Sequence, residues 1–153
     1  MLRRNSSDPL RDLDQLARLA VFDYLVGNCD NHLKNLSVLR DGKTLWLAPA
    51  YDIVCTTFFE HLSREMGRRL GTTRVIDEVT SSDFAVLSRD LGLGAKRMQR
   101  ICGELVEQIT EAVMKAGEEG SDVLETLPFV AEDLIDDMQS RVVVVNAFAR
   151  GDT

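Results

Sequence analysis

One stretch, from Gly27 to Asp52, constrains this chain more than any other. It begins G-N-C-D-N-H-L-K-N, continues through a hairpin-like segment and ends A-P-A-Y-D. Asp30 is followed five residues later by Asn35, and Asp52 comes after the hairpin. In phosphoryl transfer one Asp orients the attacking hydroxyl, while an Asn and a later Asp hold Mg²⁺ against the nucleotide phosphates. The order therefore predicts a catalytic Asp30 and a magnesium site at Asn35 and Asp52.

The same residues carry a resemblance to a known family. The run G-N-C-D-N-H-L-K-N-L-S followed by A-P-A-Y-D resembles the C-terminal lobe of the HipA family of toxin kinases. That family has G-N-x-D-x-H-x-K-N-x-S and, roughly twenty residues later, P-x-Y-D. The resemblance extends less specifically through residues 74–84 and covers most of residues 10–150. We therefore expect a mainly α fold, a helical kinase-like C-lobe with one small β-hairpin.

The resemblance also implies an activity, cofactors and partners. The activity would be Ser/Thr protein phosphorylation from Mg·ATP in a bacterial toxin–antitoxin system, so Mg²⁺ and ATP are the expected cofactors. A small DNA-binding antitoxin of the HipB type and a protein substrate would be the partners, and known targets of the family include aminoacyl-tRNA synthetases. Asp30 would orient the substrate hydroxyl, and Asn35 and Asp52 would hold the metal on the nucleotide.

A kinase also needs a glycine-rich loop over the phosphates and a lysine on an earlier strand. Neither pattern precedes Asp30, where we expect a flexible leader (residues 1–7) and then a helix. HipA-like kinases carry these parts in an N-terminal lobe. Residues 8–150 are therefore predicted to be the C-terminal lobe, which would transfer phosphate poorly or not at all without an N-lobe.

Two neighbours of Asp30 are further candidate catalytic residues with open roles. His32 could orient the loop through a hydrogen bond, and Lys34 could neutralise the transferring phosphate or be a surface lysine without a role. Protein kinases usually have a histidine two residues before the aspartate. Here Asn28 occupies that place and the histidine follows, as in the HipA-like pattern. Tyr51 is predicted to pack in the core beside the metal-binding turn.

A zinc site competes for some of these residues. Cys29 and His32, together with Cys55 and His61, could supply four zinc ligands. The second pair is separated by five residues, outside the commonest zinc spacing, so we favour magnesium.

A second function also competes with catalysis. The chain could be a non-catalytic helical module that binds an antitoxin or a partner lobe, because a net charge of -7 suits a basic DNA-binding partner. Asp30→Ala would distinguish the two functions, since only a kinase would lose phosphotransfer.

Composition excludes several other classes. The net charge of -7 and a pI near 4.8 disfavour direct binding to nucleic acid. No apolar run approaches the roughly 20 residues that span a bilayer, so no membrane is expected. Three widely spaced cysteines predict no disulfide framework and a cytoplasmic location. We interpret a basic cluster as solvated surface rather than a phosphate contact; it consists of Arg64, Arg68, Arg69 and Arg74.

Capping and turn signals predict the order of the elements. Asp8 and Pro9 begin a helix that Gly27 ends. Asp41-Gly42 predicts a type I′ hairpin turn, whose second strand returns Asp52 towards the catalytic loop. The later predictions are loops at Gly67 and Gly71, a capped helix from Thr80–Asp83, a helix over 95–115, an acidic loop at 117–122, and a helix from Pro128 that includes Val142–Val145.

Overall fold

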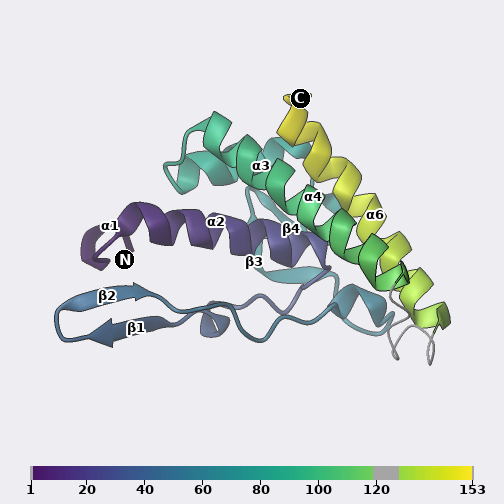
Figure 1. Ribbon diagram of the computed structural model, residues 1–153, viewed down its shortest axis with the longest axis horizontal. Coiled ribbons are helices and arrows are strands. Elements are labelled where there is room, and N and C mark those ends of the chain that lie inside the picture. Colours follow the sequence, from purple (N-terminus) through teal and green to yellow (C-terminus); the bar gives the residue numbers. More distant parts are fainter. Residues whose placement is uncertain (1, 119–127, 153) are drawn as a thin grey trace.

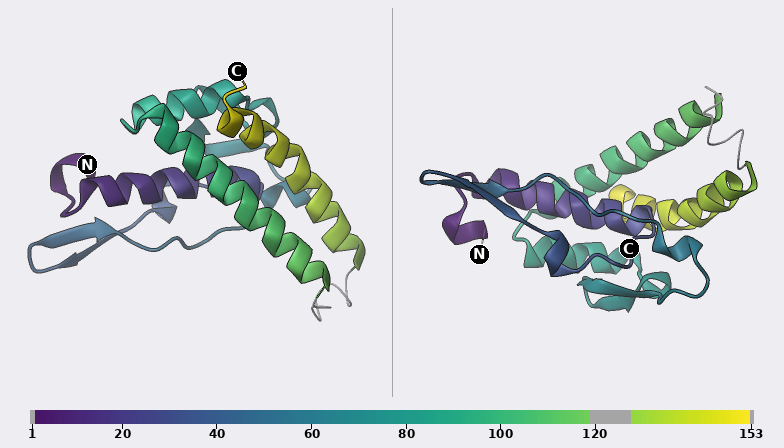
Figure 2. Two further views of the ribbon diagram at one scale, coloured as in Figure 1. Left: turned by 45° about the horizontal axis from the view of Figure 1, so that its top comes forward. Right: turned by 90° about the horizontal axis from the view of Figure 1, so that it is seen from below.

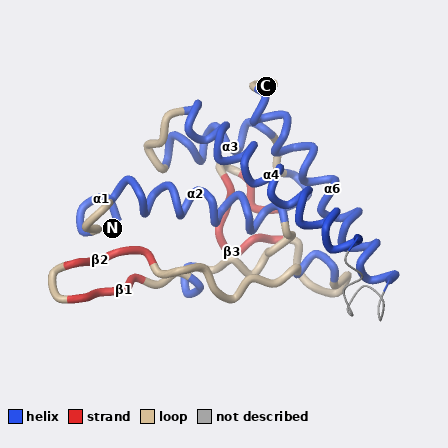
Figure 3. Tube along the Cα trace, viewed as in Figure 1, coloured by secondary structure: helices blue, strands red, loops and turns tan. Residues whose placement is uncertain are grey.

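The computed structural model describes residues 2–118 and 128–152. The fold is mainly α, as predicted, with two small antiparallel hairpins (Figures 1 and 3). The helices are α1 Leu2–Asn5, α2 Pro9–Leu25, α3 Ser81–Asp90, α4 Ala95–Glu118 and α6 Pro128–Arg150. The strands are β1 Val38–Asp41, β2 Thr44–Leu47, β3 Glu65–Leu70 and β4 Thr73–Val75, and short 3-10 helices cover Leu33–Asn35, Thr56–Phe58 and Ile76–Glu78.

Helix α2 begins and ends where the capping signals place it. The Asp8 side chain accepts a hydrogen bond from the Arg11 amide at 3.2 Å, and Pro9 is the first helical residue. Gly27 has φ +72°, a left-handed conformation that a glycine adopts without strain, and it turns the chain out of the helix. The loop that carries Asp30 therefore begins at a fixed position, immediately after the end of α2.

The first hairpin forms as predicted, but its turn is shifted by one residue. Asp41 pairs with Thr44, so the two turn residues are Gly42 and Lys43. Gly42 has φ +55°, and Lys43 is not among the described non-glycine residues with positive φ. Glycine with positive φ at the first turn position is typical of a type II′ turn. The prediction of a type I′ turn at Asp41-Gly42 was wrong.

The residues expected to form a flexible leader are instead attached to this hairpin. Residues 2–5 form α1, and the amide of Ser7 donates to the carbonyl oxygen of Leu45 at 2.8 Å. The Leu45 amide donates in return to Ser7 Oγ at 2.9 Å. Further along, the buried Asp12 carboxylate accepts the Leu47 amide at 3.0 Å. The start of the chain and α2 thus fix the hairpin, which extends beside α1 in Figure 1.

The sequence did not predict the second hairpin. Gly67, expected in a loop, lies within β3, and Gly71 makes the turn to β4 with φ +58°. The capping box that follows is confirmed: Asp83 accepts the Thr80 amide at 3.0 Å, and α3 begins at Ser81. Burial opposes ionisation of Asp83, but hydrogen bonds from Thr80, Thr73 and Thr72 outweigh it and lower its pKa.

Helices α4 and α6 lie side by side along one face of the molecule (Figures 1 and 2). The four valines 142–145 are helical, as predicted, and Val145 is fully buried. Residues 117–118 are helical rather than loop, and most of the predicted acidic loop lies outside the described residues. The core lies where α2, α3, α4, α6 and β3 meet, and includes Val21, Leu25, Met66, Ile76, Phe84, Met98, Ile101, Val145 and Phe148.

Candidate functional site

The loop of residues 27–35 passes between β3 and the 3-10 turn Thr56–Phe58. The Gly67 amide in β3 donates to the Cys29 carbonyl oxygen at 2.8 Å. On the other side, the Cys29 amide donates to Thr56 Oγ1 at 2.7 Å. Cys29 itself is buried. The backbone of the loop is therefore fixed on both sides immediately before Asp30.

The buried carboxylate of Asp23 in α2 supports the loop through hydrogen bonds. The Asp23 carboxylate accepts Asn28 Nδ2 at 2.8 Å and Arg68 Nη2 at 2.8 Å. Asn28 Oδ1 in turn accepts the Asp30 amide at 3.1 Å, while Arg68 donates through Nε to the Asn31 carbonyl oxygen at 2.5 Å. Asp23 and Asn28 are each 2% exposed. This chain of contacts sets the backbone position of Asp30.

Burial opposes both charges of the Asp23–Arg68 pair, and their mutual attraction offsets part of that cost. Burial raises the pKa of Asp23, and the hydrogen bond from Asn28 and the charge of Arg68 reduce the increase without cancelling it. Burial likewise lowers the pKa of the Arg68 guanidinium. Because a buried carboxylate without a cation is strongly unfavourable, Arg68 favours the ionised form of Asp23.

Asp30 presents an exposed carboxylate beside a small pocket. Its Oδ1 lies 3.2 Å from Nε2 of His32, so the histidine is placed to orient it. The pocket has a volume of about 270 Å³ and is lined by Cys29, Asp30, His32, Thr56, Leu62, Ser63 and Glu65. A substrate hydroxyl could therefore approach Asp30 from solvent.

Asn35 is held with its amide nitrogen turned towards the loop. Nδ2 donates to the Asp30 carbonyl oxygen at 2.8 Å. Among the described residues no hydrogen bond engages Asn35 Oδ1. This leaves its oxygen, the atom that Mg²⁺ prefers, available for a ligand.

Tyr51 joins the Asp52 segment to the same loop. Its hydroxyl donates to the Lys34 carbonyl oxygen at 2.9 Å and lies 2.7 Å from Ser37 Oγ. Tyr51 is 43% exposed, so the prediction that it packs in the core was wrong. The hairpin therefore returns Tyr51, the neighbour of Asp52, to Lys34, the neighbour of Asn35.

Asp52 has the one positive φ, +58°, among the described non-glycine residues. Such a conformation is uncommon for residues with a Cβ atom and gathers at functional sites. In the part of the chain that the structure describes, no hydrogen bond or ion pair engages the exposed Asp52 carboxylate. The Lys34 side chain is also exposed, and only its carbonyl oxygen has a hydrogen bond among these residues.

The available donors fit magnesium better than zinc. Asn35 Oδ1 and the Asp52 carboxylate are hard oxygen donors, and Mg²⁺ is commonly bound by one or two carboxylates together with phosphate oxygens. Within the described ranges no three His, Cys, Asp or Glu side chains gather as a metal-binding group, so the four residues of the competing zinc hypothesis do not come together. The three cysteines are free thiols, as predicted.

Two of the four arginines predicted to form a solvated surface have structural roles instead. Arg68 is half-buried against Asp23, and Arg64 pairs with Asp77 at 2.5 Å. Arg69 and Arg74 are exposed, which agrees with the prediction.

Sequence reasoning missed the support beneath the loop. Asp23, Asn28 and Arg68 were not predicted to act together. An aspartate inside the apolar stripe of α2 was the available signal, since a charge there needs a buried partner.

Comparisons with known proteins identify the family of the chain. Residues 1–113 match the family model of the HipA-like C-terminal domain, so the chain belongs to that family. It is 33% identical over 123 residues to "Putative kinase Y4mE" and 29% identical over 142 residues to "Putative kinase Y4dM", both from Sinorhizobium fredii. These alignments cover 80% and 91% of the chain but only 29% and 33% of the relatives.

A solved structure has the same fold. It is the HipA toxin of Shewanella oneidensis MR-1 in complex with HipB and operator DNA, and it has a TM-score of 0.63 at 20% identity. The match covers 98% of this chain and 34% of that protein. The chain thus spans about a third of the proteins it matches. None of the described helices combines the length and apolar character that a membrane span requires.

Proposed function

We propose that this chain is the hydroxyl-orienting and metal-binding half of a serine/threonine protein kinase. The observation that carries the proposal is the Asp30–Asn35 pair. One loop exposes the Asp30 carboxylate, and the bond from Asn35 Nδ2 to the Asp30 carbonyl oxygen leaves Asn35 Oδ1 free. Membership of the HipA-like C-terminal domain family and the kinase names of two relatives support the same chemistry.

Each residue of the site has a specific role in this proposal. Asp30 accepts a hydrogen bond from the substrate hydroxyl and orients it for attack on the γ-phosphate. His32 holds the Asp30 carboxylate in place. Lys34 lies in the same loop as Asp30 with an exposed side chain, and it neutralises charge on the transferring phosphate. Catalysis then consists mainly of positioning and of charge stabilisation.

Asn35 and Asp52 would hold Mg²⁺. The metal, when bound, neutralises charge on the β- and γ-phosphates of ATP. Tyr51 keeps the two ligands in neighbouring segments through its bonds to Lys34 and Ser37.

The remaining parts of the kinase lie outside residues 1–153 in this proposal, either in the same protein or on a separate chain. A nucleotide-binding lobe supplies the glycine-rich loop and its lysine, so residues 1–153 alone transfer phosphate poorly or not at all. The structural relative is a HipA bound to HipB, which supports an antitoxin of the HipB type as a partner here. The acceptor is a protein hydroxyl.

The test is phosphotransfer by the chain assembled with its nucleotide-binding lobe. Asp30→Ala should lower kcat by roughly 10³-fold or more, because the hydroxyl loses its orienting group. Asp41→Ala, which removes an exposed carboxylate from β1, is the matched control and should retain activity. If Asp30→Ala keeps full activity while binding to an antitoxin is intact, the chain is an interaction module and the kinase proposal is wrong.

A further inference from the structure

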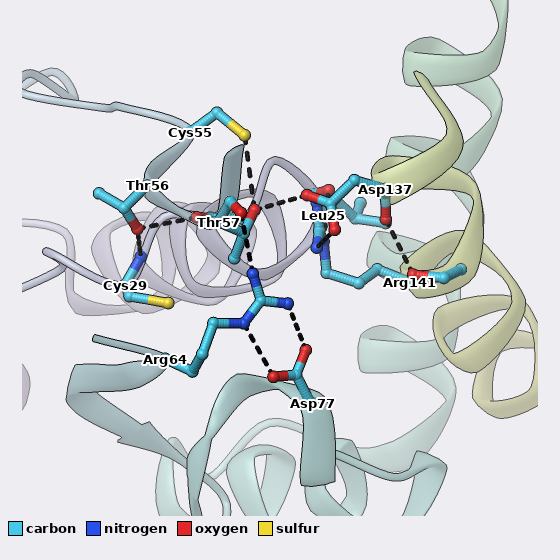
Figure 4. Close-up of polar contacts among 11 residues, drawn as sticks. Leu25, Cys29, Cys55, Thr56, Thr57, Arg64, Asp77, Asp137 and Arg141 are labelled. Atoms are coloured by element: carbon cyan, nitrogen blue, oxygen red, sulfur yellow. Dashed lines mark hydrogen bonds and ion pairs between the residues drawn. The ribbon is translucent and has the colours of Figure 1, made fainter. Parts of the chain in front are cut away.

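A buried arginine in α6 reaches the end of the helix that carries the catalytic loop. Arg141 is 4% exposed, and its Nε donates to the Leu25 carbonyl oxygen at 3.1 Å. Its two terminal nitrogens bind the two oxygens of Asp137, one turn earlier in α6, at 2.9 and 2.7 Å. Each of the three guanidinium nitrogens thus donates one hydrogen bond to a fixed partner (Figure 4).

Asp137 also binds the segment that follows Asp52. Thr57 Oγ1 donates to Asp137 Oδ2 at 2.5 Å, and the Thr57 carbonyl oxygen accepts Arg64 Nη1 at 2.9 Å. Burial opposes ionisation of Asp137, but the bonds from Arg141 and Thr57 outweigh it and hold its pKa below the ordinary value. The 3-10 turn is therefore held from two sides, as Figure 4 shows.

Gly27, the first residue of the catalytic loop, is enclosed by the same groups. A Cβ atom at Gly27 would lie 2.0 Å from Thr57 Oγ1 and 2.8 Å from Arg141 Nη2. The Gly27 carbonyl oxygen accepts the amides of Thr56 and Thr57 at 3.0 and 3.1 Å. The left-handed turn that starts the loop is therefore packed directly against the α6 arginine.

We propose that Arg141, together with Asp137, is a positioning residue for the phosphotransfer site. The pair joins the end of α2, the first residue of the loop and the turn after Asp52, so it fixes the two halves of the site relative to each other. This proposal rests on the proposed function. Both residues lie beyond residues 1–113, the part that matches the family model. Neither lines the pocket beside Asp30, so they act through the backbone of their partners.

Arg141→Lys is the first test. A lysine keeps the charge near Asp137, but a single ammonium cannot bind both Asp137 oxygens and the Leu25 carbonyl oxygen with the geometry of the fork. We expect the amide NMR signals of residues 27–30 to shift in the 153-residue chain. In the kinase assembled with its nucleotide-binding lobe, kcat should fall about 10-fold or more with KM for ATP changed less than about threefold.

Thr57→Val is a second, less disruptive variant. It removes the hydroxyl that binds Asp137 and leaves the contact from Arg141 to Leu25 in place. We expect smaller shifts of the residue 27–30 amides and a kcat loss of about threefold. If Arg141→Lys does not fold, Thr57→Val serves as the test alone. An unchanged kcat together with unchanged amide signals of residues 27–30 in Thr57→Val would overturn the proposal.

Asp14→Asn is the matched control for general destabilisation. Asp14 also binds two arginines, Arg18 and Arg97 at 3.2 and 2.5 Å, but between α2 and α4, away from the loop. It should lower Tm while leaving kcat and the residue 27–30 amides unchanged. If Arg141→Lys lowers Tm in the same way and leaves kcat unchanged, Arg141 is structural only.

The failure of positioning can be separated from the failure of the proposed function. Full activity of Asp30→Ala would overturn the kinase proposal, whatever Arg141 does. Loop amides that do not move in Arg141→Lys would overturn the positioning role alone, because that measurement needs no catalysis.

Discussion

The imidazole ring of His32 lies directly over Gly67 of β3. A Cβ atom built at Gly67 would be 2.5 Å from His32 Nδ1, closer than two such atoms can approach. The other ring nitrogen, Nε2, is 3.2 Å from Oδ1 of Asp30. The absence of a side chain at Gly67 therefore gives His32 the place from which it reaches the proposed catalytic carboxylate.

Gly67→Ala should displace this histidine without unfolding the protein. The His32 side chain is 58% exposed and can move away, so the free energy of unfolding should change by less than about 1 kcal/mol. Losing the contact with Asp30 should lower kcat of the assembled kinase about 10-fold. Steady-state kinetics and the ring signals of His32 in NMR spectra measure the two effects.

Gly103→Ala is the control for this substitution. At Gly103 in α4 the nearest neighbouring atom would be the Ala149 Cβ at 3.9 Å, an ordinary contact. Alanine should stabilise the helix by about 0.5–1 kcal/mol and leave kcat unchanged. If Gly67→Ala also leaves kcat unchanged, His32 does not position Asp30.

Arg68→Met should reveal how much Asp23 depends on its cation. Removing Arg68 leaves a buried carboxylate without a counter-charge, which costs about 3–5 kcal/mol of the free energy of unfolding at pH 7. The pKa of Asp23, already raised by burial, should rise further. Urea denaturation at pH 7 and at pH 5 measures both effects.

The sign of the pH dependence follows from that raised pKa. A folded-state pKa above the unfolded one means that the folded protein binds the proton more tightly, so stability is lost as pH rises through the folded pKa. The Arg68→Met variant should therefore become more stable relative to wild type as pH falls from 7 to 5. Arg69→Met, at an exposed neighbouring position, should stay within about 0.5 kcal/mol of wild type at both pH values. A pH-independent loss in Arg68→Met would show that Asp23 is not the group involved.

Tyr51→Phe should weaken the attachment of the Asp52 segment to the 27–35 loop. The substitution removes the hydroxyl that contacts Lys34 and Ser37, which is worth about 0.5–1.5 kcal/mol. Because Tyr51 is 43% exposed, Tm should change little, while affinity for Mg·ATP should fall about 2- to 10-fold. Ser37→Ala keeps the bond to Lys34 and should have the smaller effect in calorimetric titrations. Unchanged affinity in Tyr51→Phe would mean that this hydroxyl does not align the metal ligands.

Local signals in the sequence were sufficient for much of the fold. The Asp8 cap, the Thr80–Asp83 capping box and the apolar periodicity of the long helices each predicted an element that the structure contains. The β3–β4 hairpin was missed because its strands are short and carry Gly67 and several charges. Their pairing depends on contacts with the 27–35 loop rather than on local propensity.

The candidate site was predicted residue by residue, but its supports were not. Asp30 and Asn35 follow from a spacing within one loop, and the structure joins them by a hydrogen bond. Arg68 contacts this loop from 37 residues away, and Arg141 contacts the end of α2, just before the loop, from 116 residues away. No single-sequence pattern encodes such pairs, because their partners are chosen by tertiary packing.

The most direct test of the account is a titration of Mg·ATP into the 153-residue chain, followed by NMR and calorimetry. Asp52→Ala is compared with wild type, with Asp41→Ala as the exposed-carboxylate control. We predict shifts at residues 30–35 and around Asp52 that require Mg²⁺, vanish with EDTA, survive in Asp41→Ala and are lost in Asp52→Ala. Binding that is unchanged in Asp52→Ala, or shifts that avoid the 30–35 segment, would contradict the assignment of this loop as the metal half of a kinase site.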